Sequence, residues 1–415
     1  MSVENMNPAT NIAIINEWFY VVAGAEKVLA EVLHLYPGSD LYALVDFMPK
    51  EDRKLFGNSQ VFTSFIQKLP FAKRLFRQYL PFMPLAIEQF DLAKYEAVVS
   101  LHHAVAKGVV TRADQLHVSY VHTPMRYAWD LQHEYLRESR MTWGLRSMLA
   151  RMIMHYLRMY DRLAADRVDV FVANSNYVAR RINKTYRREA EVIYPPVDVA
   201  DFKLCREKED FYITASRLVP YKRIDLIVAA FQQLPDRKLL VFGDGPELKK
   251  LKALAGKNVE LRGYTAKQEL RDHLQRARAF IFAADEDFGI APVEAQACGT
   301  PVIAYGRGGA LETVVEGRTG TFFPQQTPAS VCEAIHAFER MEDRFEPEAI
   351  RHHAEGFSAE RFRREFSALM ERELARLRRG DAPRHLELEA GNTEHQTFLA
   401  EKRHIPRSVS SVSGS

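Results

Sequence analysis

The chain has 415 residues, and at roughly 150 residues per domain this length predicts two or three domains. Hydrophobic residues make up 47% and charged residues 27%, with only 20 Gly and 19 Pro, which excludes collagen-like, low-complexity and largely disordered chains. The 57 basic and 54 acidic side chains give a net charge of +3, so the overall balance does not indicate a polyanionic partner.

Cysteine usage and hydropathy indicate the cellular compartment in which the protein is expected. Cys205, Cys298 and Cys332 form no metal-ligand spacing and no even disulfide framework, which favours a reducing compartment. No apolar run reaches the roughly 18 residues of a spanning helix, and residues 1–10 lack the features of a signal peptide. We therefore expect a cytoplasmic protein whose membrane contact, if it has any, is peripheral and at the inner face of the membrane.

The first half of the chain alternates strand-like and helix-like segments. Residues 11–16 (NIAIIN) are a β-rich apolar run, and apolar residues then recur at helical spacing over residues 28–35. Further strand-like runs follow in YEAVVSLHH, LHVSYVHTP, VDVFVANSN and AEVIYPPVD. This alternation is typical of a parallel sheet with helices on both faces, and we assign residues 1–197 to one Rossmann-like, doubly wound domain.

After the stiff Pro195-Pro196 pair the same alternation begins again. It predicts a second Rossmann-like domain over residues 198–357, a charged helix over 358–380 that packs back toward the first domain, and a disordered tail over 381–415. The predicted fold is α/β, with two doubly wound domains facing each other. Such sheets bind ligands at the carboxyl ends of their strands, so we expect the site in the cleft between the domains.

The most informative motif lies in the second domain, where Glu286 and Glu294 are separated by seven residues. Phe288, Gly289 and Ile290 stand at the start of the helix that carries Glu294, and backbone N–H groups there suit a phosphate. Glu294, about one turn further on, is placed to accept from a vicinal diol such as a ribose. As an isolated pair, the two glutamates would be read as a surface acid and an exposed helix residue.

Two cations change that interpretation. Arg217 and Lys222 follow the first strand of the second domain, at the edge where a doubly wound sheet binds ligands. One planar guanidinium and one ammonium suit a diphosphate and would stabilise its negative charge as a leaving group. The alternative for such a pair is a solvated turn.

Through these motifs the chain resembles the retaining glycosyltransferases of family 4, which have the two-domain GT-B architecture, from residue 11 to about residue 378. Glu286 and Glu294 match the family's E-x7-E element, and Arg217 and Lys222 match its diphosphate-binding pair. The segments GDGPELKKL and CGTPVIAYGRGGALETVVEGRTG match the family's following strand and glycine-rich turn. The resemblance implies that Glu294 holds the ribose, that Glu286 holds a sugar hydroxyl, and that the turn Phe288–Ile290 contacts phosphate and sugar.

The first domain carries three further matches. VVAGAEKV resembles the family's glycine loop, in which Gly24 is kept and Ala23 replaces the first glycine. His122, in YVHTPMRYAWD, matches a histidine that points into the cleft and contacts the sugar's 6-hydroxyl; as a single histidine it would be read as a buried one bonded to a backbone carbonyl. Arg126 and Tyr127 are candidates for the acceptor side, or equally for packing and capping.

The triplet Asp285-Glu286-Asp287 formally supplies the D-x-D carboxylates that other glycosyltransferases use to hold a divalent metal. Because Arg217 and Lys222 already suit the diphosphate, we expect a metal-independent enzyme without a cofactor.

Residues 61–167 hold 15 Lys and Arg against 9 Asp and Glu, a local excess of six. Within them, residues 61–90 mix apolar and basic side chains, and Leu145, Met148, Met152, Tyr156 and Leu163 share one helical face among arginines. This pattern predicts peripheral contact with an anionic membrane, and the alternative is an apolar face packed in the core. A nucleic-acid partner is not expected, because no basic stripe is interleaved with stacking aromatics.

The resulting hypothesis is a retaining hexosyltransferase that uses a nucleotide diphosphate sugar and a glycan or polyprenyl-diphosphate-linked saccharide acceptor. HTPMRYAWD and GRGGALETV look more like the bacterial mannosyltransferases of polysaccharide or O-antigen assembly, which suggests GDP-mannose. UDP-glucose, UDP-galactose and a UDP-N-acetylhexosamine remain alternatives, as do two other classes of protein, a nucleotide-sugar epimerase and a non-catalytic binding module.

Overall fold

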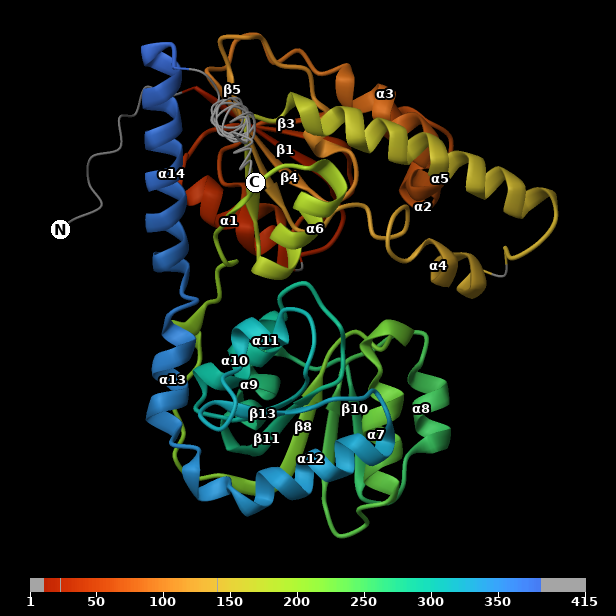
Figure 1. The fold of residues 1–415 in the computed structure, drawn as a ribbon, viewed down its shortest axis with the longest axis vertical. Helices are drawn as coiled ribbons and strands as arrows, with labels where there is room; N and C mark the ends of the chain where they lie inside the picture. Colours follow the sequence, from red (N-terminus) through yellow and green to blue (C-terminus); the bar gives the residue numbers. More distant parts are fainter. Residues whose placement is uncertain (1–10, 23, 140, 382–415) are drawn as a thin grey trace, which may run out of the picture.

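The computed structural model describes residues 11–22, 24–139 and 141–381, so the expected disorder of the tail lies almost wholly outside the described residues. Two parallel sheets, each with helices on both faces, form two domains that lie one above the other in Figure 1. The predicted α/β class with two Rossmann-like domains is therefore confirmed.

The N-terminal sheet has the strand order β3-β2-β1-β4-β5-β6-β7, and all neighbouring strands are parallel. Its strands are β1 (Ile12–Phe19), β2 (Asp40–Asp46), β3 (Val61–Thr63), β4 (Ala97–His102), β5 (Leu116–Val121), β6 (Val170–Ala173) and β7 (Glu191–Val192). The central strands are buried on both faces, which explains their continuous apolar runs. The order reverses between β1 and β4, where an open parallel sheet places its ligand.

Helices cover both faces of this sheet. They are α1 (Gly24–Leu35), α2 (Ala72–Leu75), α3 (Met83–Glu88), α4 (Gln132–Glu138), α5 (Leu145–Ala164) and α6 (Asn176–Tyr186). Helix α1 contributes Val28, Leu29 and Val32 to the core on one face. On the other face α3 and the inner side of α5 contribute Met83, Ile87 and Leu157.

The C-terminal sheet has the order β10-β9-β8-β11-β12-β13, again parallel between all neighbours. Its strands are β8 (Glu209–Ala215), β9 (Leu239–Phe242), β10 (Val259–Gly263), β11 (Ala277–Phe282), β12 (Val302–Tyr305) and β13 (Gly320–Phe323). Its helices are α7 (Ile224–Gln232), α8 (Leu248–Leu254), α9 (Lys267–Arg276), α10 (Ile290–Ala297), α11 (Ala310–Thr313) and α12 (Pro328–Arg340). The order of these six strands matches that of β1 to β6 in the N-terminal sheet. The strand order therefore reverses at the corresponding place in each sheet, between β1 and β4 and between β8 and β11.

The last two helices run along both domains (Figure 1). Helix α13 (Pro347–Glu355) packs against α10 of the C-terminal domain, and α14 (Ala359–Arg379) packs against α1 and β5 of the N-terminal domain. Between them, the Ser358 side chain caps α14 by accepting from the Arg361 N–H, and Gly380 ends α14 with a φ of 74°. The chain thus crosses from one domain to the other a second time.

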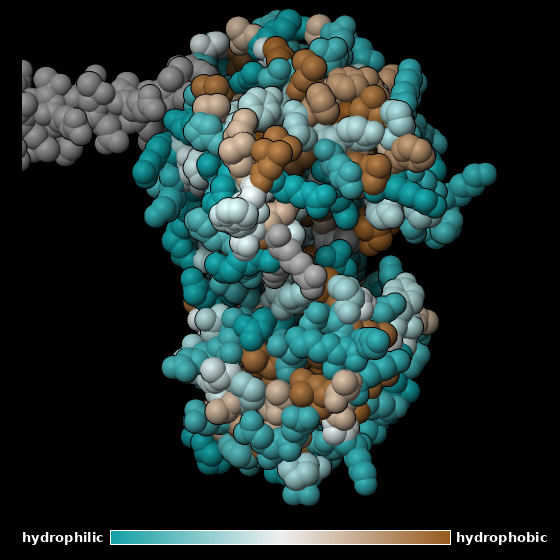
Figure 2. All heavy atoms as spheres, turned by 90° about the vertical axis from the view of Figure 1, so that its right-hand side faces the viewer, coloured by the Kyte–Doolittle hydropathy of each residue, from teal (hydrophilic) through white to brown (hydrophobic). Residues whose placement is uncertain are grey.

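The apolar face of α5 does not pack in the core. Leu145, Met148, Met152, Tyr156 and Leu163 are between 41% and 76% exposed, so the core-packing alternative is wrong for these residues. In the space-filling view, hydrophobic groups are visible on this side of the upper domain, and the surface is notched between the two domains (Figure 2).

The packing of α14 generates a first prediction. Phe362 and Phe366 stack with their ring centroids 5.6 Å apart and are fully buried in the N-terminal core. Phe362→Ala should lower the free energy of unfolding by about 3–5 kcal/mol through lost burial and the cavity left behind. Urea unfolding followed by circular dichroism measures this. Arg364→Ala, on the exposed side of the same helix, should change it by no more than about 0.5 kcal/mol; equal effects would contradict the assignment.

Candidate active site

The loop after β8 carries both predicted cations of the C-terminal domain. Arg217 is exposed, and no ion pair joins it to another described residue. Lys222 ends a short 3-10 turn and is mostly buried. The next strand, β9, ends in a glycine turn that packs directly on this loop, since a Cβ on Gly243 would lie 1.8 Å from the Ser216 carbonyl oxygen. Close backbone packing therefore fixes where the cations are presented.

The turn after β11 leads into α10, the helix that carries Glu294. Gly289 precedes the helix with a φ of 88°, a left-handed conformation that a side chain would strain. The Phe288 ring is buried against Tyr194 and Phe357, so Phe288 anchors the turn and leaves the backbone as the part that a ligand could reach. Gly309 of the glycine-rich turn lies against it, where a Cβ would come within 2.3 Å of the Phe288 Cα.

Both glutamates of the spaced pair form ion pairs. Lys222 donates to Glu286 within the C-terminal domain. Lys27, on α1 of the N-terminal domain, donates from Nζ to Oε1 of Glu294 at 2.9 Å and lies 3.5 Å from Asp198. Burial opposes the charge on Lys27, but Glu294 and Asp198 hold its pKa above the ordinary value. The two carboxylates of the spaced pair are thus both neutralised, one of them by a lysine of the opposite domain.

The glycine loop of the first domain faces the same helix. Gly24 begins α1, and a Cβ placed on it would lie 3.0 Å from Cδ1 of Ile290 at the start of α10. Gly24 and Ile290, predicted from distant motifs, therefore meet across the domain boundary. Ala23, the departure from the usual glycine loop, lies outside the described residues.

His122 directly follows β5, at the carboxyl edge of the N-terminal sheet. Its backbone is fixed on both sides, because its N–H donates to the His102 carbonyl at 2.9 Å and its carbonyl accepts from the Asn174 side chain at 2.9 Å. Its Nε2 is buried and makes no hydrogen bond within the described part of the chain. Burial lowers the pKa of His122 to about 3, so the ring is neutral and its Nε2 is free to bond a ligand.

Arg126 and Tyr127 lie in different surroundings. Nη1 of Arg126 lies 3.8 Å from Oδ2 of Asp287, so it faces the C-terminal domain. Tyr127 is half-buried beside the N-terminal core, with its ring 6.3 Å from that of Tyr135. The structure therefore brings Arg126 to the domain boundary and places Tyr127 in packing contacts.

Each carboxylate of the Asp285-Glu286-Asp287 triplet has a cation of its own. Arg307 lies 3.2 Å from Asp285, Lys222 pairs with Glu286, and Arg181 of α6 lies 2.6 Å from Asp287. Across the described residues, no group of three or more His, Cys, Asp or Glu is arranged to hold a metal ion. The triplet serves as a set of ion-pair partners, two within the C-terminal domain and one reaching across to the N-terminal domain.

Sequence reasoning missed a buried polar network under the N-terminal part of the site. Oε1 of Glu17 accepts from four consecutive backbone N–H groups, those of residues 103–106, at 2.6–3.1 Å. Burial would raise the pKa of Glu17, but the neighbouring His103 and His102 hold it well below its usual range. The fully buried Lys107 then pairs with Asp161. Only the charged residue inside the apolar strand NIAIINEWF hinted at this.

Three cross-domain contacts were missed for a different reason. Lys27 and Glu312 stand within quoted motifs but were not singled out there, and Arg181 stands in none; the partners of all three lie more than 100 residues away. Glu312 accepts from the backbone N–H groups of Asn176 and Tyr177 at 2.7 and 2.8 Å, at the start of α6. These pairs join the two domains at or next to residues predicted to bind the donor, since they include Glu294 itself and Asp287, which stands between Glu286 and Phe288.

Comparison with known proteins follows the domain division. Residues 24–201 match the family described as Glycosyltransferase Family 4, and residues 199–355 match the one described as Glycosyl transferases group 1. A GDP-mannose-dependent alpha-(1-6)-phosphatidylinositol monomannoside mannosyltransferase of Mycolicibacterium smegmatis is 39% identical over 26% of this chain and 33% of its own length. A D-inositol 3-phosphate glycosyltransferase of Mycobacteroides abscessus is 29% identical over 48% of this chain and 50% of its own. The chain thus spans half or less of these relatives.

Solved structures share the fold over nearly the whole chain. Sucrose-phosphate synthase of Thermosynechococcus elongatus superposes with a TM-score of 0.68 at 17% identity, covering 88% of this chain and 99% of that one. The Anabaena protein HepE, solved in complex with UDP, has a TM-score of 0.64 at 16% identity, covering 87% and 100%. At these identities the likeness establishes the two-domain architecture.

Buried histidines generate a pH prediction. Burial lowers the pKa of His122 to about 3 and that of His117 to about 4, whereas an unfolded histidine titrates near 6.5. Below pH 6.5 only the unfolded chain binds these protons. The contribution of the neutral histidines to the free energy of unfolding is therefore fully present above pH 6.5 and decreases as the pH falls toward 4. Each histidine should cost about 2 kcal/mol between pH 6.5 and 5.

Urea unfolding at pH 7.0, 6.0 and 5.0 measures this loss. His122→Gln should lose about 2 kcal/mol less than the wild type over that interval, whereas His133→Gln, on exposed α4, should behave as the wild type. An unchanged pH dependence in His122→Gln would show that the ring titrates equally in the folded and unfolded chains, and would contradict the prediction.

Proposed function

Since the chain belongs to glycosyltransferase family 4, we propose that it transfers a hexose from a nucleotide diphosphate sugar to a hydroxyl group of a glycan or lipid-linked saccharide. One observation carries the proposal. Arg217, Lys222 and the Glu286/Glu294 pair lie at the carboxyl edge of the C-terminal sheet, and helix α10 at that edge faces Gly24 of the N-terminal domain. This is where two opposed doubly wound domains hold a substrate.

The diphosphate of the donor is the part that this edge suits best. Arg217 is exposed and has no ion-pair partner among the described residues, so its guanidinium is available to a bidentate anion. Lys222 adds a second charge, and the N-terminus of α10 adds backbone N–H groups. Together they would stabilise the negative charge that grows on the departing diphosphate.

The carboxylates and the histidine suit the hydroxyl groups of the donor. Glu294, one turn into α10, would accept from the ribose and share its charge with Lys27. Glu286 would hold a sugar hydroxyl beside Lys222. The unused Nε2 of neutral His122 would hydrogen-bond the hydroxyl at the sugar's 6-position. A donor that lacks the 6-hydroxyl would leave the buried Nε2 of His122 without a hydrogen-bond partner.

We place the reaction on the retaining pathway. The site carboxylates Glu286, Asp287 and Glu294 are all ion-paired, which makes each of them a poor nucleophile for a covalent sugar intermediate. The acceptor oxygen would instead attack the anomeric carbon on the face that the diphosphate leaves. The bond from that carbon to the diphosphate oxygen breaks, and this oxygen takes the proton of the acceptor hydroxyl.

GDP-mannose is the donor that we favour. It is supported by a relative named as GDP-mannose-dependent that is 39% identical over 129 residues. A UDP-sugar is the second candidate, because a protein of the same fold has been solved with UDP. No metal enters the proposed mechanism, since the triplet carboxylates are each paired with an arginine or lysine.

A donor panel tests the function. The chain is incubated with GDP-mannose, UDP-glucose, UDP-galactose and UDP-N-acetylglucosamine, and free nucleotide and sugar products are read by mass spectrometry. We expect slow nucleotide release from GDP-mannose. Lys222→Ala should reduce it by about 10²–10³-fold, the usual effect of losing one charge-stabilising group. Lys249→Ala, on exposed α8, is the matched control. An isomerised donor would indicate an epimerase, and release from none of them a binding module.

Metal independence has its own test. Activity with the preferred donor should be unchanged in an excess of EDTA, because Arg217 and Lys222 supply the positive charge that a divalent ion supplies elsewhere. Loss of activity in EDTA that returns with Mg²⁺ or Mn²⁺ would overturn this part of the proposal and assign the triplet to a metal.

A further inference from the structure

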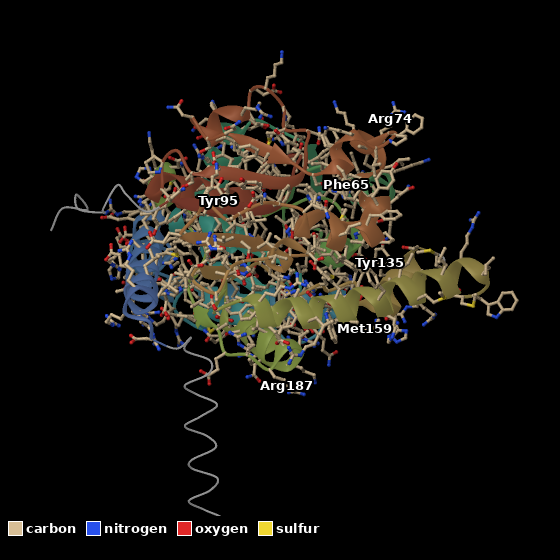
Figure 3. All side chains as sticks on the ribbon, turned by 90° about the horizontal axis from the view of Figure 1, so that it is seen from above. Phe65, Arg74, Tyr95, Tyr135, Met159 and Arg187 are labelled. Carbon is tan, nitrogen blue, oxygen red and sulfur yellow. The ribbon has the colours of Figure 1, made fainter. Side chains whose placement is uncertain are left out.

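Helix α5 presents a long apolar row to the outside of the molecule. We call it the outer row, and it consists of Leu145, Met148, Leu149, Met152, Tyr156, Met159 and Leu163, each between 41% and 76% exposed. Trp143, in the loop before the helix, is 92% exposed. Viewed from above, α5 projects past the body of the domain, with Met159 part of the way along it (Figure 3). A contiguous exposed row of this size marks an interaction surface.

Three faces can be distinguished on α5. The inner face is buried through Met154, Leu157 and Ala164. The outer row follows the spacing of three and four residues that keeps side chains on one side of a helix. At 100° per residue, Arg151 and Arg158 lie between these two faces, along one border of the outer row. Residues 141–160 contain no Asp or Glu, so the border carries no negative charge over that length.

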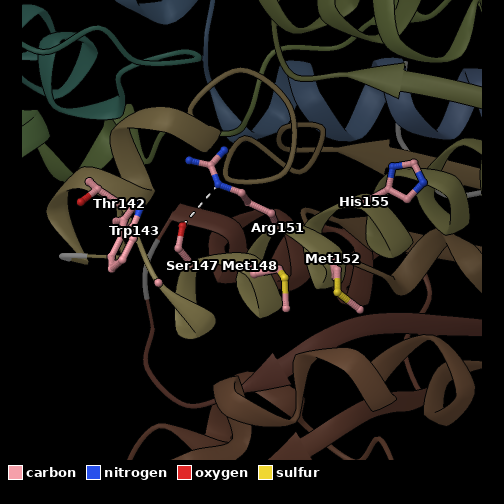
Figure 4. A pocket seen from close by; sticks show the side chains of 8 residues that line it. Thr142, Trp143, Ser147, Met148, Arg151, Met152 and His155 are labelled. Atoms are coloured by element: carbon pink, nitrogen blue, oxygen red, sulfur yellow. Dashed lines mark hydrogen bonds between the residues drawn. The ribbon is translucent and has the colours of Figure 1, made fainter.

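A groove runs along the first turns of this border (Figure 4). It has a volume of about 630 Å³ and is open to solvent. Its apolar lining comes from Trp143, Met148 and Met152, and its polar lining includes Arg151 and His155. Nε of Arg151 donates to Ser147 Oγ at 3.3 Å, which holds the guanidinium beside the apolar side chains. This places an apolar surface, which suits an acyl chain, directly beside a positive charge, which suits an anionic headgroup.

We propose that the outer row and its basic border dock on an anionic lipid bilayer. Charge complementarity selects this occupant: Arg151 on the border and Arg146 on the opposite flank of the outer row are both exposed, and residues 141–160 hold no acidic side chain to repel phosphate. The helix would lie in the plane of the interface, with Leu and Met side chains among the acyl chains and the arginines at the headgroups. Pairing with a second copy would instead bring two basic borders together. None of the helices in the described segments is long and apolar enough to span a bilayer.

Other exposed apolar residues lie on the same side of the molecule. Phe71, Phe82 and Leu85 are between 52% and 75% exposed, and Lys73 and Arg74 lie among them in the chain. Figures 1 and 3 place this segment, like α5, on the side of the N-terminal domain away from α14. The bilayer would therefore meet the domain through more than one element.

Hydrogen bonds connect α5 to the segment that leads to the candidate active site. From the far half of α5, Arg158 donates to the Ala128 carbonyl at 2.9 Å, and Asp161 accepts from the Trp129 side chain at 2.8 Å. These residues follow Arg126, which faces Asp287 at the domain boundary. Resting on the proposed transfer reaction, this arrangement favours a lipid-linked saccharide as the acceptor, delivered along the membrane to the side of the site formed by residues 126–130.

Vesicle flotation tests the docking surface. The full chain is mixed at low salt with vesicles of phosphatidylcholine alone or of phosphatidylcholine and phosphatidylglycerol at 7:3. We expect the chain to float with the anionic vesicles and to bind the neutral ones much more weakly. Arg146→Gln with Arg151→Gln should lower the partition coefficient about 25-fold, fivefold per arginine. Met148→Gln with Met152→Gln should lower it by about tenfold or more.

Tyr264→Gln is the matched control, because Tyr264 is 84% exposed on the other domain and its loss should leave vesicle binding unchanged. Equal binding of all variants, or no binding by the wild type at low salt, would overturn the proposal. So would a dimer, measured by light scattering, that the methionine substitutions dissociate while vesicle binding is absent.

Nucleotide release from the donor separates this proposal from the proposed function. The arginine and methionine variants lie outside the donor site, so their release rate without vesicles should equal that of the wild type. If the wild type binds vesicles and releases no nucleotide from any donor, the transferase proposal fails and the docking surface stands. If nucleotide release is normal and vesicle binding is absent, the docking surface alone fails.

Discussion

Ion pairs across the domain boundary are the constraint on which the site depends. Glu294 and Asp287 belong to the C-terminal domain, whereas their cations, Lys27 and Arg181, belong to the N-terminal domain. All four side chains are mostly buried, and an unpaired charge there would cost several kcal/mol. The two domains therefore complete each other electrostatically, and a donor bound between them, as proposed, would compete with or share these pairs.

Backbone packing supplies the rigidity behind these charges. Parallel strands bring the loop with Arg217 and the turn with Gly289 to one edge of the sheet, and glycines at positions 243 and 309 let neighbouring turns pack on them without side chains between. In the N-terminal domain, four backbone N–H groups converge on buried Glu17 and hold the segment after β4 beneath His122. Helix α14 then ties the chain's end to the N-terminal core.

Local sequence patterns predicted the sheets and the position of the candidate site, but they did not predict which residues pair across the domain boundary. Strand runs buried on both faces predicted parallel sheets, and the spacing of Glu286 and Glu294 predicted where carboxylates and a helix start would meet. The partners of these residues could not be predicted in the same way. Lys27 is 267 residues from Glu294, and a lysine on an amphipathic helix has no local feature that distinguishes a cross-domain cation from a solvated one. Glu17 likewise owes its role to a segment 86 residues away.

Helix α5 separates most clearly what the sequence determined from what the tertiary structure decided. The three-and-four spacing of Leu145, Met152, Tyr156 and their neighbours determined that one face is apolar, and the absence of acidic residues over 141–160 determined the sign of its border. Whether another element covers that face depends on contacts with distant parts of the chain. Only the fold shows the outer row exposed and the opposite face buried. Periodicity specifies the chemistry of a surface, because it is a local property, and the fold alone specifies what that surface meets.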